Sequence, residues 1–219
     1  MFAERGGFVG DFHEALESPL LYSPLIERAL RVAAFAHANQ SRKATTIPYL
    51  THLAGTALVL TRAGIVEERV LAAALLHDGI EDTDLTAEQI AQEFGEDVAQ
   101  MVVDASEIKL DESGQKIAWH ERKREHRHRL RECSVESRAI VLADKVHNLG
   151  TIVDDLAVDP STWTRFRATP EESIHYFETM FELAEGEESL RPVAETGAVL
   201  LQRLRRYLPV DQSSSTGSN

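Results

Sequence analysis

A run of seven apolar residues that ends in a histidine and an aspartate constrains this chain more than any other feature. The run covers Val70 to Leu76, and the next eight residues, His77 to Asp84, read HDGIEDTD. A helix that is apolar on every side must be buried. Because an unpaired carboxylate is costly to bury, the histidine and aspartate at the end of such a helix need a partner or a metal ion.

Apolar residues recur at intervals of three and four along the whole chain, whereas strict alternation rich in β-branched residues is scarce. This pattern predicts an all-α fold. Caps, prolines and glycines indicate where the helices begin and end. The expected helices cover residues 24–39, 48–63, 67–76, 86–94, 96–107, 119–132, 137–156, 170–185 and 189–208.

The composition is that of one globular domain. The 219 residues are 43% apolar and 27% charged, which suffices for a single core. We expect a domain over residues 23–209, an N-terminal extension over 1–22 and a disordered, Ser-rich tail over 210–219. No internal repeat or second domain is evident.

Charge and cysteine content restrict the partners and the compartment. A formal net charge of −13 argues against nucleic acid as a partner. The single Cys133 cannot form an internal disulfide, and neither a bilayer-spanning run nor a secretory leader is evident. These features predict a cytoplasmic protein without a membrane partner, and they leave a homo-oligomer open. Residues 116–131, with seven Lys/Arg and two acids, still allow a small phosphorylated ligand.

The acids after the apolar helix suggest a catalytic site. His77 and Asp78 offer one nitrogen and one oxygen ligand for a metal. If the backbone stays helical, Glu81 and Asp82 follow one turn later on the same face. The alternative is that His77 and Asp78 only cap the helix, and that the acids after them form a solvated loop.

Two further segments carry polar residues of interest. Asp144 interrupts the apolar stretch IVLADKVHNL, and Asn148 follows at i+4; the alternative is that Lys145 neutralises Asp144 in a plain ion pair. The segment RKATTIPYLTHL has two cations and then His52, which taken alone would be structural. Together the three segments supply two imidazoles and two carboxylates, a set suited to Mn, Fe, Co or Zn with positions left for water and substrate.

The order His52, His77 and Asp78, Asp144 resembles the H...HD...D pattern of HD-domain phosphohydrolases. The segments AFAHANQSRK, IPYLTHL, AALLHDGIEDT, FGEDVAQMV and LADKVHNL are similar to the hydrolase domain of the RelA/SpoT family, which removes the 3′-pyrophosphate from the stringent-response alarmones ppGpp and pppGpp. The resemblance covers about residues 33–176. It implies a single HD-domain bundle of about eight to ten helices. With no room for a synthetase domain after residue 209, the chain resembles the stand-alone small alarmone hydrolases.

The resemblance also implies roles for individual residues. It implies a Mn²⁺ site held by His52, His77, Asp78 and Asp144. Glu81 would orient or deprotonate water, Asp82 would protonate the departing ribose 3′ oxygen, and Asn148 would position substrate or water. The products would be GDP or GTP and pyrophosphate.

Basic and aromatic residues are expected to bind the nucleotide. Arg42 and Lys43 resemble the family's RK pair beside the nucleotide. The stretch WHERKR resembles a W-x-x-R-K run, which suggests that Arg122 and Lys123 contact the 5′-phosphates; the alternative is a charge-laced surface helix. Tyr176 resembles the aromatic residue beside the ribose, although a core tyrosine would be equally ordinary.

Four positions depart from the family's pattern. Asn39 and Ala44 stand where glycine is common, Gly150 where an arginine often follows, and Glu172 near a place where related enzymes present a cation. These departures bear on the substrate more than on the metal ligands. The alternatives to an alarmone hydrolase are therefore an HD phosphatase or phosphodiesterase acting on an adenosine alarmone or NADPH, and a non-catalytic nucleotide sensor.

Overall fold

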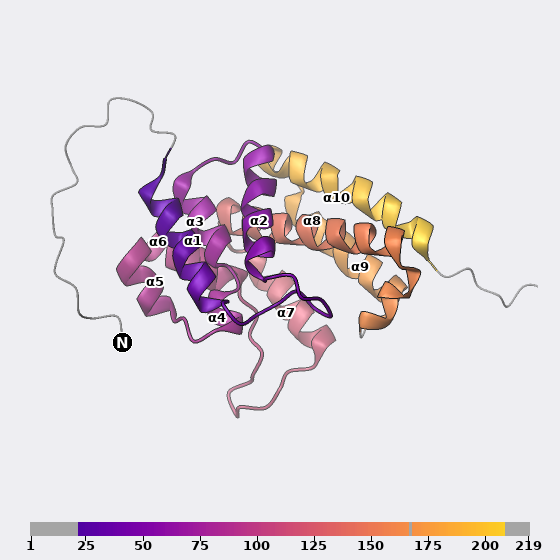
Figure 1. Ribbon diagram of the computed structural model, residues 1–219, viewed down its shortest axis with the longest axis horizontal. Helices are drawn as coiled ribbons and strands as arrows, with labels where there is room; N and C mark the ends of the chain where they lie inside the picture. Colours follow the sequence, from indigo (N-terminus) through magenta and orange to yellow (C-terminus); the bar gives the residue numbers. More distant parts are fainter. Residues whose placement is uncertain (1–21, 167, 209–219) are drawn as a thin grey trace, which may run out of the picture.

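The computed structural model describes residues 22–208 with the exception of residue 167. This part of the chain contains ten α-helices, four short 3-10 helices and no strand, so the predicted all-α fold and helix number are confirmed (Figure 1). Its two β-bridges are isolated pairs, Ser41 with Pro48 and Leu110 with Lys116. The predicted extension, apart from residue 22, and the predicted tail lie outside the described residues.

Every predicted helix is present, with ends that differ by up to four residues. The helices are α1 (Pro24–Ala36), α2 (Leu50–Arg62), α3 (Glu68–Leu76), α4 (Gly79–Asp82), α5 (Ala87–Phe94), α6 (Glu96–Ala105), α7 (Trp119–Leu130), α8 (Val135–Val158), α9 (Pro170–Phe181) and α10 (Arg191–Leu204). The 3-10 helices are η1 (Pro160–Arg165), η2 (Glu182–Ala184), η3 (Glu188–Leu190) and η4 (Arg205–Tyr207).

Side-chain caps explain several of the helix starts. The Ser23 hydroxyl accepts the backbone N–H of Ile26, and Pro24 occupies the first turn of α1. Thr86 and Thr169 form capping boxes at the starts of α5 and α9. These local signals lie in the sequence itself, which is why the boundaries were predictable.

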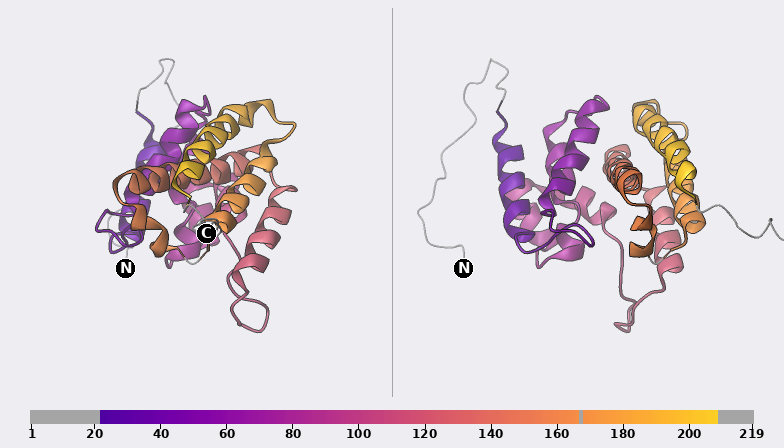
Figure 2. Two further views of the ribbon diagram at one scale, coloured as in Figure 1. Left: turned by 90° about the vertical axis from the view of Figure 1, so that its right-hand side faces the viewer. Right: turned by 45° about the vertical axis from the view of Figure 1, so that its right-hand side comes forward.

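Helix α3 is the buried centre of the larger part of the fold. All seven residues from Val70 to Leu76 are buried, as their apolar character predicted. Helices α1, α2, α6 and α8 pack around α3. The 24-residue α8 continues beyond this core and packs against α9 and α10, where a second, smaller apolar cluster forms (Figure 2). Thus α8 joins the two parts of the core.

Helix α3 does not continue through the acidic run that follows it. Helix α3 ends at Leu76, and His77 and Asp78 form a turn before the single-turn helix α4. Both turn residues keep right-handed helical torsion angles, and the backbone N–H of Asp82 bonds the carbonyl of Asp78 at 2.9 Å. The one-turn offset between Asp78 and Asp82 therefore survives the break in the helix.

None of the helices in the described ranges combines the length and the apolar character needed to cross a bilayer.

Candidate metal centre and active site

The four predicted metal ligands converge between three elements of the fold. His52 comes from the first turn of α2, His77 and Asp78 from the turn after α3, and Asp144 from the middle of α8. The ligand atoms of His52, His77 and Asp144 all lie within 4.8 Å of one another, and these three residues are buried. Oδ2 of Asp78 lies 3.2 Å from Nε2 of His77 and 3.6 Å from Nε2 of His52. Asp78 therefore completes the group.

The environment of His77 fits a cation at this point. Its Nδ1 bonds the backbone carbonyl of Ala74 at 2.7 Å, whereas its buried Nε2 has no hydrogen-bond partner among the described residues. Nε2 faces the carboxylates of Asp78 and Asp144. Burial alone would disfavour protonation, yet these two carboxylates raise the pKa of His77 to about 9. The site thus requires positive charge, and two nitrogen and two oxygen donors suit a divalent transition metal.

The two predicted carboxylate ligands are held by donors from neighbouring side chains. The Tyr49 hydroxyl donates to Oδ2 of Asp78 at 2.6 Å. Nζ of Lys145 donates to Oδ2 of Asp144 at 2.6 Å, and the Asn148 amide donates to Oδ1 of Asp144. Burial opposes ionisation of Asp144, but Lys145 and the nearby histidines hold its pKa well below the ordinary range. The ion pair considered as an alternative therefore exists, and it accompanies the ligand cluster.

His52 is held by a second histidine that the sequence had not singled out. Nδ1 of His52 lies 2.9 Å from Nδ1 of His147, which belongs to α8. Its Nε2 points to Oδ1 of Asp144 at 3.1 Å. Burial lowers the pKa of His52, and burial together with His52 lowers the pKa of His147 to about 4. Both rings are therefore neutral at pH 7.

The two predicted catalytic acids are joined by Lys109. Glu81 accepts the backbone N–H of Glu107 at 3.0 Å through Oε2, and its Oε1 lies 3.2 Å from Nζ of Lys109. Asp82 accepts from Lys109 at 2.7 Å and from the Gln40 amide at 3.4 Å. Burial raises the pKa of Glu81 above its ordinary value. A carboxylate with a raised pKa is a stronger base, as general-base catalysis near neutral pH requires.

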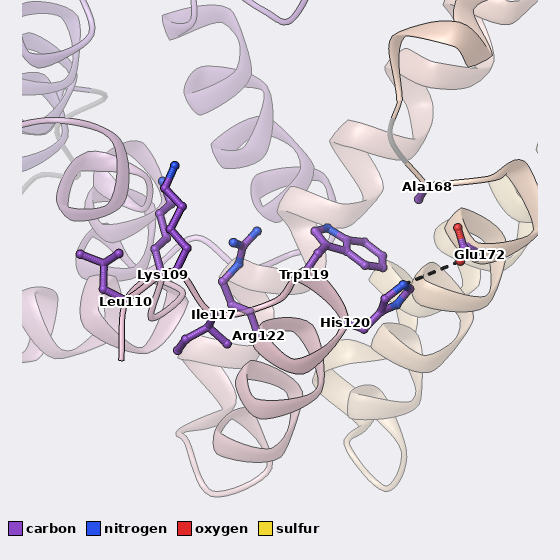
Figure 3. A pocket seen from close by; sticks show the side chains of 9 residues that line it. Lys109, Leu110, Ile117, Trp119, His120, Arg122, Ala168 and Glu172 are labelled. Atoms are coloured by element: carbon purple, nitrogen blue, oxygen red, sulfur yellow. Dashed lines mark ion pairs between the residues drawn. The ribbon is translucent and has the colours of Figure 1, made fainter. Parts of the chain in front are cut away.

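Lys109 is also one of the residues that line a pocket of about 630 Å³ (Figure 3). It is lined by Lys109, Leu110, Lys116, Ile117, Trp119, His120, Arg122, Ala168 and Glu172. Figure 3 shows Lys109, Trp119 and Arg122 extending in the same general direction, and an ion pair joins His120 to Glu172 at 3.8 Å. Because Lys109 also contacts Glu81 and Asp82, this basic and aromatic pocket adjoins the two predicted catalytic acids.

The two cations predicted to bind phosphate already have a protein partner. Nε of Arg122 and Nζ of Lys123 lie 2.6 and 2.5 Å from the carboxylate of Glu107, whose side chain is only 6% exposed. Burial would raise the pKa of Glu107, but Lys123, Lys145 and Arg122 lower it to about 2. Helix α7 thus uses these two cations to contact the segment that precedes it, and their contact with the 5′-phosphates stays a prediction.

The other predicted nucleotide contacts are Arg42, Lys43 and Tyr176. Arg42 donates to Oδ1 of Asn148 at 2.7 Å, and Asn148 in turn donates to the predicted metal ligand Asp144. Lys43 lies 5.2 Å from the ring of Phe166. The Tyr176 ring lies 5.9 Å from that of Trp119, and its buried hydroxyl has no hydrogen-bond partner in the described ranges.

The four departures from the family's pattern have different structural consequences. Ala44 has a φ of 58°, a left-handed conformation that favours glycine. Glu172 completes the capping box of α9 and borders the pocket. A side chain at Gly150 would first meet Leu200 at 3.8 Å, an ordinary contact distance. Asn39 lies exposed in the turn after α1. The loop after Arg42 and Lys43 thus adopts the glycine-like shape without glycine.

Three residues of the site were missed by sequence reasoning: Tyr49, Lys109 and His147. Two of them had a usable signal, because Tyr49 and His147 lie three positions from His52 and Asp144 respectively. Lys109 had none, since it lies in an irregular segment between α6 and α7 whose path no periodicity describes.

Comparison with known proteins agrees with this geometry. The HD domain family matches residues 29–164. The guanosine-3′,5′-bis(diphosphate) 3′-pyrophosphohydrolase MESH1 of Xenopus tropicalis is 35% identical over 164 residues, which are 74% of this chain and 84% of the relative. MESH1 of Drosophila melanogaster is 40% identical over 141 residues, 63% of this chain and 73% of the relative.

A solved structure of a metazoan ortholog of SpoT that hydrolyzes ppGpp has a TM-score of 0.61 and 32% identity, and the match covers 86% of this chain and 96% of that one. The resemblance seen in the sequence is therefore confirmed, and this chain belongs to the HD domain family, in the group that includes the MESH1 proteins.

Proposed function

We propose that this protein is a metal-dependent hydrolase that removes the 3′-pyrophosphate from (p)ppGpp and releases pyrophosphate with GDP or GTP. The observation that carries the proposal is the convergence of two imidazoles and two carboxylates, with Glu81 and Asp82 following in the single-turn helix α4 directly after Asp78. Relatives named for this reaction are 35 to 40% identical to the chain over that region. We assign the activity to the domain over residues 23–209.

Manganese is the cation that we assign to the four ligands. The donor set also accommodates Fe, Co or Zn, and four protein ligands leave open positions on a six-coordinate ion. When bound, such a cation supplies Lewis-acid catalysis at phosphorus and lowers the pKa of water. Asp78 and Asp144 are held in their charged forms by neighbours, so they are ready to bind it without first losing a proton.

Glu81 and Asp82 divide the proton transfers between them. Glu81 accepts a proton from the attacking water, for which its raised pKa suits it. The water oxygen bonds to the nearer phosphorus of the 3′-pyrophosphate, and the bond from that phosphorus to the ribose 3′ oxygen breaks. Asp82, one residue further along α4, protonates the departing oxygen. Asn148 orients the reacting groups through its contacts with Asp144 and Arg42.

The nucleotide is assigned to the basic region around the pocket. Arg42 and Lys43 lie on the loop beside Asn148, and Arg122 lines the pocket that begins at Lys109. Lys123 and Tyr176 are close together, with Nζ 4.9 Å from the ring centre. Aromatic and guanidinium groups of this kind bind a nucleoside and its 5′-phosphates.

The proposal is tested by the products formed from a panel of nucleotides. The panel contains ppGpp, pppGpp, their adenosine counterparts and NADPH, each incubated with and without Mn²⁺ and separated by anion-exchange chromatography. We expect pyrophosphate and GDP from ppGpp, none with Asp78→Ala, and full activity with Asp84→Ala, an exposed acid of the same run. Release of orthophosphate, or turnover of NADPH alone, would assign the site to the alternative HD phosphatase; binding without turnover would indicate a sensor.

A further inference from the structure

The two ligand histidines are held by different kinds of partner. Nδ1 of His77 faces the carbonyl of Ala74, which can only accept, so that nitrogen carries a proton and Nε2 is the nitrogen left to face a cation. Nδ1 of His52 instead faces Nδ1 of His147 at 2.9 Å. An imidazole nitrogen can donate or accept. The tautomer of His52 therefore depends on that of His147.

A hydrogen bond between these two Nδ1 atoms uses one proton, and the ring that carries this proton decides whether His52 can bind a metal. If His52 carries the proton at Nδ1, its Nε2 presents a lone pair beside Asp144. If His147 carries it, Nε2 of His52 is protonated and cannot be a ligand. The partner of a metal-bound histidine commonly selects the tautomer in this way.

We propose that His147 is a positioning residue that accepts the Nδ1 proton of His52 and thereby keeps Nε2 of His52 free for the cation. The inference rests on the proposed metal site. It assigns His147 a hydrogen-bonding role, in addition to any packing role between α2 and α8, two helices that contact each other closely.

Gly55 provides the space that this contact needs. A Cβ atom at Gly55 would lie 2.1 Å from Nε2 and 2.2 Å from Cδ2 of His147. Gly55 lies three positions after His52 in α2, and His147 lies three positions after Asp144 in α8. Because glycine inside a helix is otherwise unfavourable, its use here has a packing reason. We infer that an alanine at this position would displace the His147 ring from His52.

Two substitutions at His147 distinguish the effect of its hydrogen-bond acceptor from the effect of its volume. His147→Leu keeps a side chain of similar reach, but this side chain is apolar and cannot accept a hydrogen bond. His147→Asn places an amide oxygen near the position of Nδ1, where it accepts the proton of His52. His120→Leu is the control, because this histidine is exposed and belongs to the pocket wall.

The test measures Mn²⁺ affinity of the full chain by calorimetry, with melting of the metal-free proteins followed by circular dichroism. We expect His147→Leu to weaken Mn²⁺ binding by about 10- to 100-fold, as losses of such partners generally do. His147→Asn should recover most of the affinity, and His120→Leu should leave it unchanged. Equal losses for the Leu and Asn variants, or wild-type affinity for the Leu variant, would overturn the proposal.

A double-mutant cycle provides a second route that does not depend on the leucine variant folding. Gly55→Ala should weaken Mn²⁺ binding in the wild-type background and have no further effect in a His147→Ala background, because the ring that it displaces is then absent. Equal effects of Gly55→Ala in both backgrounds would contradict the inference. Failure of the wild-type chain to bind any divalent cation would instead contradict the metal site of the proposed function.

Discussion

The ammonium group of Lys109 lies 2.7 Å from Oδ1 of Asp82. The same group bonds the backbone carbonyl of Glu81 at 3.0 Å and lies 3.2 Å from its Oε1. Burial opposes the charge of Lys109, but these acids raise its pKa. One lysine from the segment between α6 and α7 thus joins both proposed catalytic acids to the pocket wall.

Replacing Lys109 should shift the pH dependence of the reaction. Burial raises the pKa of Glu81, and the charge of Lys109 lowers it. Lys109→Met removes only the lowering effect, so the pKa of Glu81 rises further. Because Glu81 must be deprotonated to act as the base, the acid limb of kcat/KM should move to higher pH.

The measurement for Lys109 is the pH profile of kcat/KM at saturating Mn²⁺. Lys116→Met is the matched control, because Lys116 lines the same pocket but forms no ion pair with the acids in the described residues. Its acid limb should stay in the wild-type position. A limb that stays fixed in Lys109→Met would exclude Glu81 as the titrating base.

Glu107 should contribute strongly to stability at neutral pH. Its side chain is 6% exposed and its pKa is lowered from 4.5 to about 2. A lowered carboxyl pKa gives stability that is fully present above pH 4.5 and is lost as the pH falls toward 2. We expect Glu107→Gln to lower the free energy of unfolding by roughly 3 kcal/mol at pH 7.

Urea unfolding at several pH values checks the role of Glu107. The difference between wild type and Glu107→Gln should narrow between pH 4.5 and the lowest pH at which both remain folded. Glu112→Gln, at an exposed turn position, should behave as wild type throughout. A difference that does not depend on pH would mean that Glu107 acts through packing and not through its charge.

Tyr49 should strengthen metal binding through Asp78. Its hydroxyl donates to Oδ2 of Asp78 at 2.6 Å, and burial together with Asp78 raises its pKa, so it stays a neutral donor. Tyr49→Phe should weaken Mn²⁺ binding by about tenfold, measured by calorimetry. Tyr22→Phe is the control, since Tyr22 is 57% exposed. Unchanged affinity in Tyr49→Phe would show that Asp78 needs no such support.

Ala44 should carry backbone strain in the loop after Arg42 and Lys43. Its φ of 58° is costly for any residue with a Cβ, by about 1–2 kcal/mol. Ala44→Gly removes that cost, but the greater freedom of glycine stabilises the unfolded chain by about 0.4–1 kcal/mol. We therefore expect the free energy of unfolding to rise by about 0.5 kcal/mol. Ala63→Gly, at a φ of −78°, should destabilise the protein instead. Thermal unfolding of both variants tests the difference, and a loss of stability in Ala44→Gly would contradict it.

The parts of this protein that sequence reasoning predicted well are those with a local cause. Neighbouring residues alone predicted the burial of α3, from its apolar run, and the starts of α1 and α5, from the caps at Ser23 and Thr86. They also predicted the polar pair His77 and Asp78 at the end of α3. The predicted end of α3 at Leu76 is confirmed, whereas the single-turn helix α4 was not predicted, because four residues are too few to show a helical period.

The contacts that sequence reasoning missed all join residues far apart in the chain. His52 and His147 are 95 positions apart, and Lys109 and Asp82 are 27 positions apart. Their side chains meet only because α2 packs against α8 and because the segment before α7 returns to α4. The ion pairs of Arg122 and Lys123 with Glu107 have the same origin, since no pattern in α7 identifies the acid that they contact.

The most direct test of the central claim is the reaction of metal-free protein with ppGpp while Mn²⁺ is added in steps. The account predicts that release of pyrophosphate and GDP rises until one ion is bound per chain and then stays constant, and that Asp144→Asn releases neither product at any Mn²⁺ concentration. Pyrophosphate release by the metal-free protein, or by Asp144→Asn, at the same rate as by the Mn²⁺-loaded wild-type protein would contradict the account.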